Sequence, residues 1–311
     1  MQIQAFQPAV QALFNEVQDR LDGQIILETE PRQEEWVAFD QSGHRRDAQG
    51  NVHIILVHST QPDFTLAHEL HHVLFEITLG PQVQFPVTTA RPELDQQIQI
   101  TAQALVGSVE HGLIMDQQRA RQEITPAIEH DFIQGIAHKV PTASNYFPLQ
   151  VLMLLDALTF SDGQDLADWQ TTYAAAFVAA QKLYQQLKKH LRATPTGIHR
   201  SIVELWQRYS QLLEQHQYLA LPYSDFISLA PVLSPRQLRL TVEQLFFIKH
   251  LPFNSLKTHQ RAYALVGRQD QQNAGELLSA TKVTSVVYQQ WYQQPVQEFL
   301  QQQQIQYQLR T

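Results

Sequence analysis

The chain has 311 residues, 43% of them hydrophobic, with a formal net charge of −8 and no cysteine. This length and apolar content allow one large or two moderate domains, and the acidic balance disfavours a surface devoted to nucleic acid, which needs clustered Lys and Arg. The absence of cysteine excludes disulfides and thiolate ligands, so any metal must be held by His, Asp or Glu.

A helix and three strands are the first predicted elements. Residues 8–21 place apolar side chains at helical spacing, and a proline stands in the first turn. Residues 24–29, 35–40 and 51–59 are rich in Ile, Val, Trp and Phe, as strands are. The polar stretch 41–51 predicts a hairpin or an extended loop that leads into the third strand.

The sequence carries no signal for membrane or secretory targeting. Its N-terminal segment has neither the basic region nor the long apolar region of a secretory signal. Every apolar run is shorter than the roughly 18 to 20 residues that a membrane-spanning helix needs. We therefore expect a cytoplasmic protein without a membrane partner.

The stretch from Gln61 to Glu76 carries an H-E-x-x-H motif formed by His68, Glu69 and His72. Its apolar residues fit one side of a helix, which returns to the same face after four residues. Both histidines can then reach one metal ion, and Glu69 can contact a metal-bound water without being a ligand. These residues predict a zinc site with Glu69 as catalytic base; the alternative is a set of hydrogen-bonded core or surface histidines.

The motif resembles the zincin metallopeptidases, and the run Thr65 to Leu70 with His72 is also similar to the ImmA/IrrE-type metallopeptidases. The likeness spans about fifty residues and is specific for chemistry rather than substrate. It implies an active-site helix behind a small sheet, a third zinc ligand further along the chain, and an edge strand that binds substrate by backbone hydrogen bonds. By this resemblance residues 52–57 form the edge strand, although their apolar run also fits an interior strand.

A helix predicted at 92–115 supplies the candidates for the third ligand, since a catalytic zinc usually has three protein ligands. Glu110 is the first choice, because this carboxylate interrupts the apolar half of the helix. Glu93 is the second: its interval from His72 resembles thermolysin-like spacing, but an acid in a first helical turn also favours the helix dipole. His111 is the third, as a ligand or as a hydrogen-bond partner of one.

Two departures from known patterns limit the resemblance. The metzincin extension requires glycine at position 75 and histidine at 78, where this chain has Phe75 and Thr78. The ImmA/IrrE pattern has a glutamate just before an Ala-Asn pair, and no glutamate stands at the corresponding place in Thr101-Ala102-Gln103. A gluzincin-like site remains the expectation.

The second half of the chain reads as helical, with apolar residues at helical spacing and prolines between the segments. The expected helices are 148–160, 164–192, 197–217, 235–251 and 284–307. We predict an α+β fold in which a small antiparallel or mixed sheet with the zincin helices precedes a mostly α-helical C-terminal half. The expected domains are a catalytic one, 1–145, and a helical one, 146–311.

The predicted function is that of a zinc-dependent metallopeptidase with one zinc ion held by His68, His72 and Glu110. Glu69 acts as general base, and the partner is a peptide or protein substrate rather than nucleic acid. The alternative is a non-catalytic helical binding or regulatory protein that retains a zincin-like zinc site. The sequence leaves the substrate and the oligomeric state open.

Overall fold

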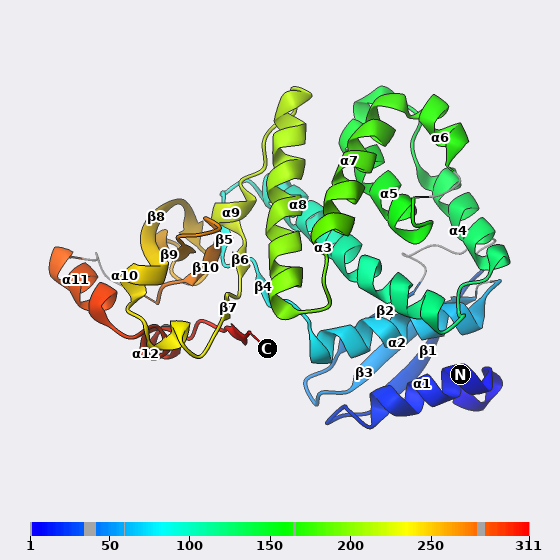
Figure 1. The fold of residues 1–311 in the computed structure, drawn as a ribbon, viewed down its shortest axis with the longest axis horizontal. Helices are drawn as coiled ribbons and strands as arrows, with labels where there is room; N and C mark the ends of the chain where they lie inside the picture. The colour runs from blue at the N-terminus through cyan, green and yellow to red at the C-terminus, as the bar shows by residue number, and fades with distance from the viewer. Residues whose placement is uncertain (1, 34–41, 59, 164–165, 279–283, 311) are drawn as a thin grey trace. The chain divides into compact units, whose positions relative to one another are not determined.

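The structure is a computed structural model that describes residues 2–33, 42–58, 60–163, 166–278 and 284–310 (Figure 1). The fold is α+β, as predicted, with a sheet near each end of the sequence. The chain forms two compact units, neither of which is a continuous segment. Unit 1 contains Met1–Gly80 and Glu110–Lys188, and unit 2 contains Pro81–Val109 and Lys189–Thr311. A domain boundary after residue 145 stays a prediction.

Unit 1 contains a mixed three-stranded sheet in the order β1-β3-β2. β1 (Ile25–Gln33) runs parallel to the central strand β3 (Val52–His58), and β2 (Ser42–Arg46) runs antiparallel to it. The strands expected at 24–29 and 51–59 are confirmed, while the one expected at 35–40 lies outside the described residues. The mixed sheet agrees with the fold class that the sequence predicts.

One expectation about this sheet is confirmed and another is wrong. The stretch 41–51 leads into β3 through a hairpin, one of its two predicted alternatives: residues 42–46 form β2, and the turn that follows joins β2 to its antiparallel partner β3. Residues 52–57 do not form the edge strand, since β3 has a strand on each side. The apolar run of β3 is therefore that of an interior strand.

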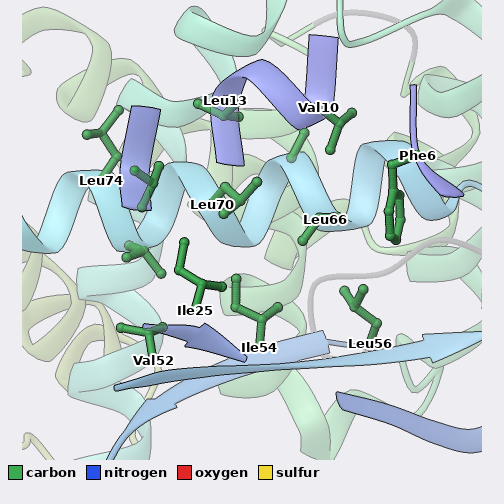
Figure 2. Close-up of a cluster of buried hydrophobic side chains, with 13 residues drawn as sticks. Phe6, Val10, Leu13, Ile25, Val52, Ile54, Leu56, Leu66, Leu70 and Leu74 are labelled. Carbon is green, nitrogen blue, oxygen red and sulfur yellow. The ribbon is translucent and has the colours of Figure 1, made fainter. Parts of the chain in front are cut away.

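Helices α1 (Pro8–Gln18) and α2 (Pro62–Thr78) pack with the sheet around one core. Alternate residues of β3 point into this core, and Figure 2 shows them directed towards α2. Burial of an aliphatic side chain of this kind stabilises the fold by about 1.5 to 3 kcal/mol. The fully buried members that join the strand to the helix are Val52, Ile54, Leu66, Leu70 and Val73.

Helices make up the remainder of unit 1. They include the C-terminal part of α3 (Pro92–Ala120), the long helix that contributes residues to both units. They are joined by α4 (Pro126–Lys139), α5 (Phe147–Phe160), α6 (Ala167–Thr172) and α7 (Ala174–His190). Short 3-10 helices occupy Ile3–Ala5 and Ser144–Tyr146. α3 and α5 supply the residues that complete the site described below.

Unit 2 contains a four-stranded antiparallel sheet in the order β10-β9-β8-β5. Its strands are β5 (Val87–Thr88), β8 (Phe246–Ser255), β9 (Arg261–Gly267) and β10 (Asn273–Glu276). Two smaller sheets pair β4 (Val83–Gln84) with β6 (Ser228–Leu229) and β7 (Val232–Leu233) with β11 (Gln308–Leu309). The helices are α8 (Pro195–Gln215), α9 (Tyr223–Phe226), α10 (Val242–Leu245), α11 (Ser285–Gln293) and α12 (Val296–Gln302).

This sheet corrects the expectation of a mostly α-helical C-terminal half. Residues 235–251, predicted as one helix, form the 3-10 turn Gln237–Arg239, the single turn α10 and the first part of β8. The apolar run from Leu245 to Ile248 fits a buried helix and a buried strand equally well by its pattern. Pairing with β9, which lies further along the sequence, decides in favour of the strand.

Among the described residues, no helix combines the length and the apolar character that crossing a membrane requires.

Candidate metal centre

Two histidines of α2 face each other at the centre of the candidate site. Their Nε2 atoms, on His68 and His72, lie 3.1 Å apart, and the ring centroids are separated by 4.7 Å. The four-residue interval places both rings on one side of the helix, as the motif predicts. Two nitrogens with lone pairs at this distance repel each other unless a proton or a cation lies between them. The pair is thus arranged to share a cation.

A third histidine, His111 of α3, joins this pair. Its ring centroid lies 5.3 Å from that of His68 and 5.1 Å from that of His72. One potential ligand atom from each of the three residues lies within 4.8 Å of the others. His68 and His111 are buried and His72 is half-buried. The three histidines could hold a metal ion, and nitrogen donors of this kind suit Zn²⁺ among other transition metals.

An oxygen atom lies near the second nitrogen of each ring. The Nδ1 atom of His68 is 3.1 Å from Oε1 of Gln118, and that of His72 is 3.3 Å from a carboxylate oxygen of Glu110. His111 has an oxygen of Asp156, on α5, 3.8 Å from its Nδ1. For His68 and His72, an acceptor within hydrogen-bond distance of Nδ1 favours the tautomer that carries its proton there, which leaves Nε2 free to bind a metal.

Burial keeps His68 in the form that a metal ion binds. Removal from water, reinforced by the neighbouring His72 and His111, holds the pKa of His68 well below its usual range. The hydrogen bond with Gln118 acts in the opposite direction but does not outweigh these effects. A neutral imidazole is the ligand that divalent metals require, so no proton has to be displaced from this ring near neutral pH.

Glu69 is buried beside the histidines, and β2 holds its carboxylate. Ser42 Oγ donates a hydrogen bond of 2.7 Å to Oε1, and Nδ1 of His44 lies 3.0 Å from Oε2. Burial by itself would raise the pKa of Glu69, but the hydrogen bonds from His44 and Ser42 and the proximity of His72 lower it. Glu69 is therefore an anion at neutral pH despite its buried position.

The alternation of β2 explains how these polar groups reach α2. In the antiparallel pairing, Ser42 and His44 stand opposite Leu56 and Ile54, so they share the face of the sheet that α2 covers. Because serine and histidine alternate along β2, the strand directs polar side chains from this face of the sheet towards the motif helix. This alternation is the signal in the sequence for Ser42 and His44, neither of which was predicted as a site residue.

His44 connects Glu69 with a second glutamate, Glu76, two helical turns further along α2. Its Nε2 lies 2.8 Å from Oε1 of Glu76. Burial acts to lower the pKa of His44, but the hydrogen bonds with the two carboxylates outweigh it and raise the pKa to about 10. Both ring nitrogens donate to carboxylates, which requires the doubly protonated, cationic ring.

The three candidates for the third ligand occupy different places. The structure brings His111 into the group of histidines, while its neighbour Glu110 lies beside the outer nitrogen of His72. Glu93 stands in the first turn of α3 and belongs to unit 2, so it is not part of this group. Gln118 and Asp156, whose oxygens lie near the Nδ1 atoms of His68 and His111, carry no motif and were not identifiable from the sequence.

Comparison of the chain with protein-family models, with characterised proteins and with solved structures finds no match.

Proposed function

We propose that this protein is a zinc-dependent metallopeptidase whose metal is held by His68, His72 and His111. The observation that carries this proposal is the convergence of three imidazoles beside Glu69, which follows His68 on the same helix. Three nitrogen ligands and a neighbouring carboxylate are the usual parts of a hydrolytic zinc site. The geometry favours His111 over Glu110 as third ligand, and Glu110 then orients His72 through its outer nitrogen.

The donor set is chemically suited to zinc. All three donors are imidazoles, and three protein ligands leave the fourth, tetrahedral position for water or substrate. When bound in such a site, zinc acidifies a coordinated water and polarises the carbonyl of the scissile bond.

Glu69 is the proton acceptor in this proposal. Its carboxylate is anionic and is oriented by Ser42 and His44, so it is prepared to take a proton and later return it to the leaving amine. His44 links Glu69 to Glu76, whose side chain is 43% exposed. This hydrogen-bonded chain offers a route by which the buried carboxylate exchanges protons with solvent.

The peptide nature of the substrate is inferred from the resemblance of the motif to zincins, in which the substrate pairs with a strand edge. In the described part of the three-stranded sheet β2 lies at an edge, and it also carries the two groups that hold Glu69. We place the peptide-binding strand at β2 rather than at β3.

A non-catalytic metal-binding protein is the second candidate. The observation that favours it is that both carboxylate oxygens of Glu69 already accept hydrogen bonds, from Ser42 and from His44. A fully satisfied, buried carboxylate can serve to stabilise the site without ever accepting a proton from water.

Zinc content and peptide hydrolysis, measured on the same preparations, separate the two candidates. We expect the wild-type chain to bind zinc and to cleave peptides from a mixed fluorogenic library, and Glu69→Gln to keep the zinc. Loss of the general base should reduce turnover by about a hundred- to ten-thousand-fold. Glu129→Gln, on α4 of the same unit, is the matched control and should retain activity.

One result would decide against the peptidase, and another against the role of Glu69. Full zinc loading of the wild type without cleavage of any peptide would favour the non-catalytic protein. Undiminished turnover by zinc-loaded Glu69→Gln would remove Glu69 from the mechanism.

A further inference from the structure

A groove runs along one side of α8, within unit 2. Its lining residues on α8 recur every three or four positions from Thr196 to Gln207, which is one face of the helix. The rest of the groove is lined mainly by three further segments, residues 231–233, 245–246 and 267–271. The volume of about 710 Å³ lies within the range of roughly 300 to 1,000 Å³ that is typical of small-molecule sites.

Positive charge predominates in this groove, although the whole chain carries a net charge of −8. Three arginines and two acidic residues line it. Arg200 pairs with Glu204, on the next turn of α8, at 2.8 Å. Arg268 and Arg310 have no carboxylate within 4 Å among the residues that the structure describes. The groove therefore contains two arginines that form no ion pair with a carboxylate of the described residues.

The other acidic residue of the groove, Asp270, is occupied elsewhere. Its carboxylate lies 3.0 Å from Nε2 of His199 and accepts a hydrogen bond of 3.1 Å from the backbone of Gln272. Burial would raise the pKa of Asp270, but the hydrogen bonds from His199 and Gln272 lower it. The oxygens of Asp270 are thus engaged by His199 and Gln272, and Asp270 forms no ion pair with Arg268 or Arg310.

Backbone contacts hold both arginines in place. Arg268 donates from its Nε to the carbonyl of Glu243 at 2.7 Å and from its backbone to the carbonyl of Leu245 at 2.9 Å. Arg310 follows β11, and its backbone N–H donates to the carbonyl of Leu233 at 2.9 Å. Fixing Nε of Arg268 leaves its two terminal nitrogens as donors, which is the arrangement that binds carboxylate and phosphate groups.

Thr196 provides an independent indication of a ligand. Its Oγ1 is buried and has no hydrogen-bond partner among the described residues. Thr196 lies in the first turn of α8, a helix of 21 residues, where the backbone amides and the helix dipole favour negative charge. A buried hydroxyl without a partner is costly, and an oxygen atom of a bound anion would satisfy it.

We propose that this groove binds a small ligand with at least one doubly charged or two singly charged anionic groups, of the phosphate or carboxylate type. Arg268 and Arg310 supply the charge and Thr196 donates a hydrogen bond. The site belongs to unit 2 and uses none of the residues of the metal centre, so it is independent of the proposed peptidase activity.

Calorimetric titration of the full chain with inorganic phosphate and, separately, with succinate tests the site. Saturable binding of phosphate alone indicates a phosphoryl ligand, and saturable binding of succinate alone indicates a dicarboxylate. We expect the Arg268→Gln/Arg310→Gln double variant to bind the preferred anion at least about tenfold more weakly. Arg208→Gln, which changes an arginine of α8 outside the groove, should bind as the wild type does.

A second measurement uses the wild-type protein, so it does not depend on the folding of a variant. Phenylglyoxal modifies accessible arginines, and mass spectrometry locates the modified residues. The preferred anion should protect Arg268 and Arg310 but leave Arg208 reactive. The proposal would be overturned if neither phosphate nor succinate bound saturably. It would also be overturned if the double variant bound the anion as tightly as the wild type does.

Discussion

Two histidines on opposite faces of the three-stranded sheet make nearly the same contacts. His44 of β2 bridges Glu69 and Glu76, and His53 of β3 bridges Glu28 and Asp47 at 2.6 and 3.2 Å. The contacts with these carboxylates raise the pKa of each histidine above its usual value. By residue type and by pairwise distance, the two clusters are hard to tell apart.

What differs is the element that covers each face. The side chain of Glu69 is 5% exposed because it lies between α2 and the face of the sheet that α2 covers. The side chain of Glu28, on the other face, is 38% exposed. α2 covers the face of the sheet that carries His44, and its histidines His68 and His72 contact His111 of α3. A histidine between two acids therefore does not define a site. The convergence of two helices on the same buried point does.

The largest effect is expected from removing the histidine that α3 contributes. His111→Gln should weaken zinc binding by more than the roughly 10- to 100-fold that loss of an outer partner costs, because a direct ligand is lost. Competition with a chromogenic zinc chelator measures the affinity. Unchanged affinity in His111→Gln together with complete loss in Glu110→Ala would restore Glu110 as the third ligand.

A smaller loss is expected when the carboxylate behind His72 is removed. Glu110→Ala deletes the oxygen that lies 3.3 Å from Nδ1 of His72, so the ring loses its fixed orientation while all three imidazoles remain. Zinc affinity should fall by roughly 10- to 100-fold. The same chelator competition checks this value, and an affinity equal to that of the wild type would show that Glu110 has no part in the centre.

The contribution of His44 to stability should depend on pH. Because its pKa rises from 6.5 to about 10 in the folded chain, its contribution is fully present below about pH 6.5 and is lost as the pH rises through about 10. The pKa values of Glu69 and Glu76 are lowered despite burial, by His44 in each case. Their contribution is therefore present above their unfolded pKa of 4.5 and is lost as the pH falls.

Urea unfolding of the wild type and His44→Gln at several pH values, in the presence of a chelator, tests this dependence. The difference in unfolding free energy should be on the order of 2 to 4 kcal/mol near pH 6. It should decrease towards pH 10 and above. A difference that is the same at pH 6 and at pH 10.5 would mean that the ring contributes by packing rather than by charge.

The smallest effect is expected on the face of the sheet that carries His53. His53→Gln removes a ring that contacts Glu28 and Asp47 but touches no residue of the metal centre. The side chains of Glu28 and Asp47 are 38% and 21% exposed, so solvent screens these pairs more than the pair with Glu69. Stability should therefore change less than in His44→Gln, and zinc affinity should be unchanged. Unfolding and chelator competition measured side by side check this expectation, and a loss of zinc binding would contradict the distinction between the two faces.

Local patterns in the sequence determined the elements that carry half of the site. The helical spacing of the motif places His68 and His72 on one side of α2, since four residues make about one turn whatever surrounds them. The apolar runs of β1 and β3 and the periodicity of α1, α2 and α3 likewise identify these elements within a few residues. Each of these features depends only on neighbours along the chain.

The tertiary structure alone decided which residues complete the site. Glu110 and His111 are adjacent in sequence and point in directions about 100° apart on α3, so only the packing of α3 against α2 selects the ring that joins the histidine pair. β2 is a strand because β3 pairs with it, and residues 246–251 form a strand because β9 does. Arg268 and Arg310 share a groove although more than forty residues separate them. Contacts between distant segments have no periodicity in the sequence, and the pairing and packing that create them are properties of the folded chain.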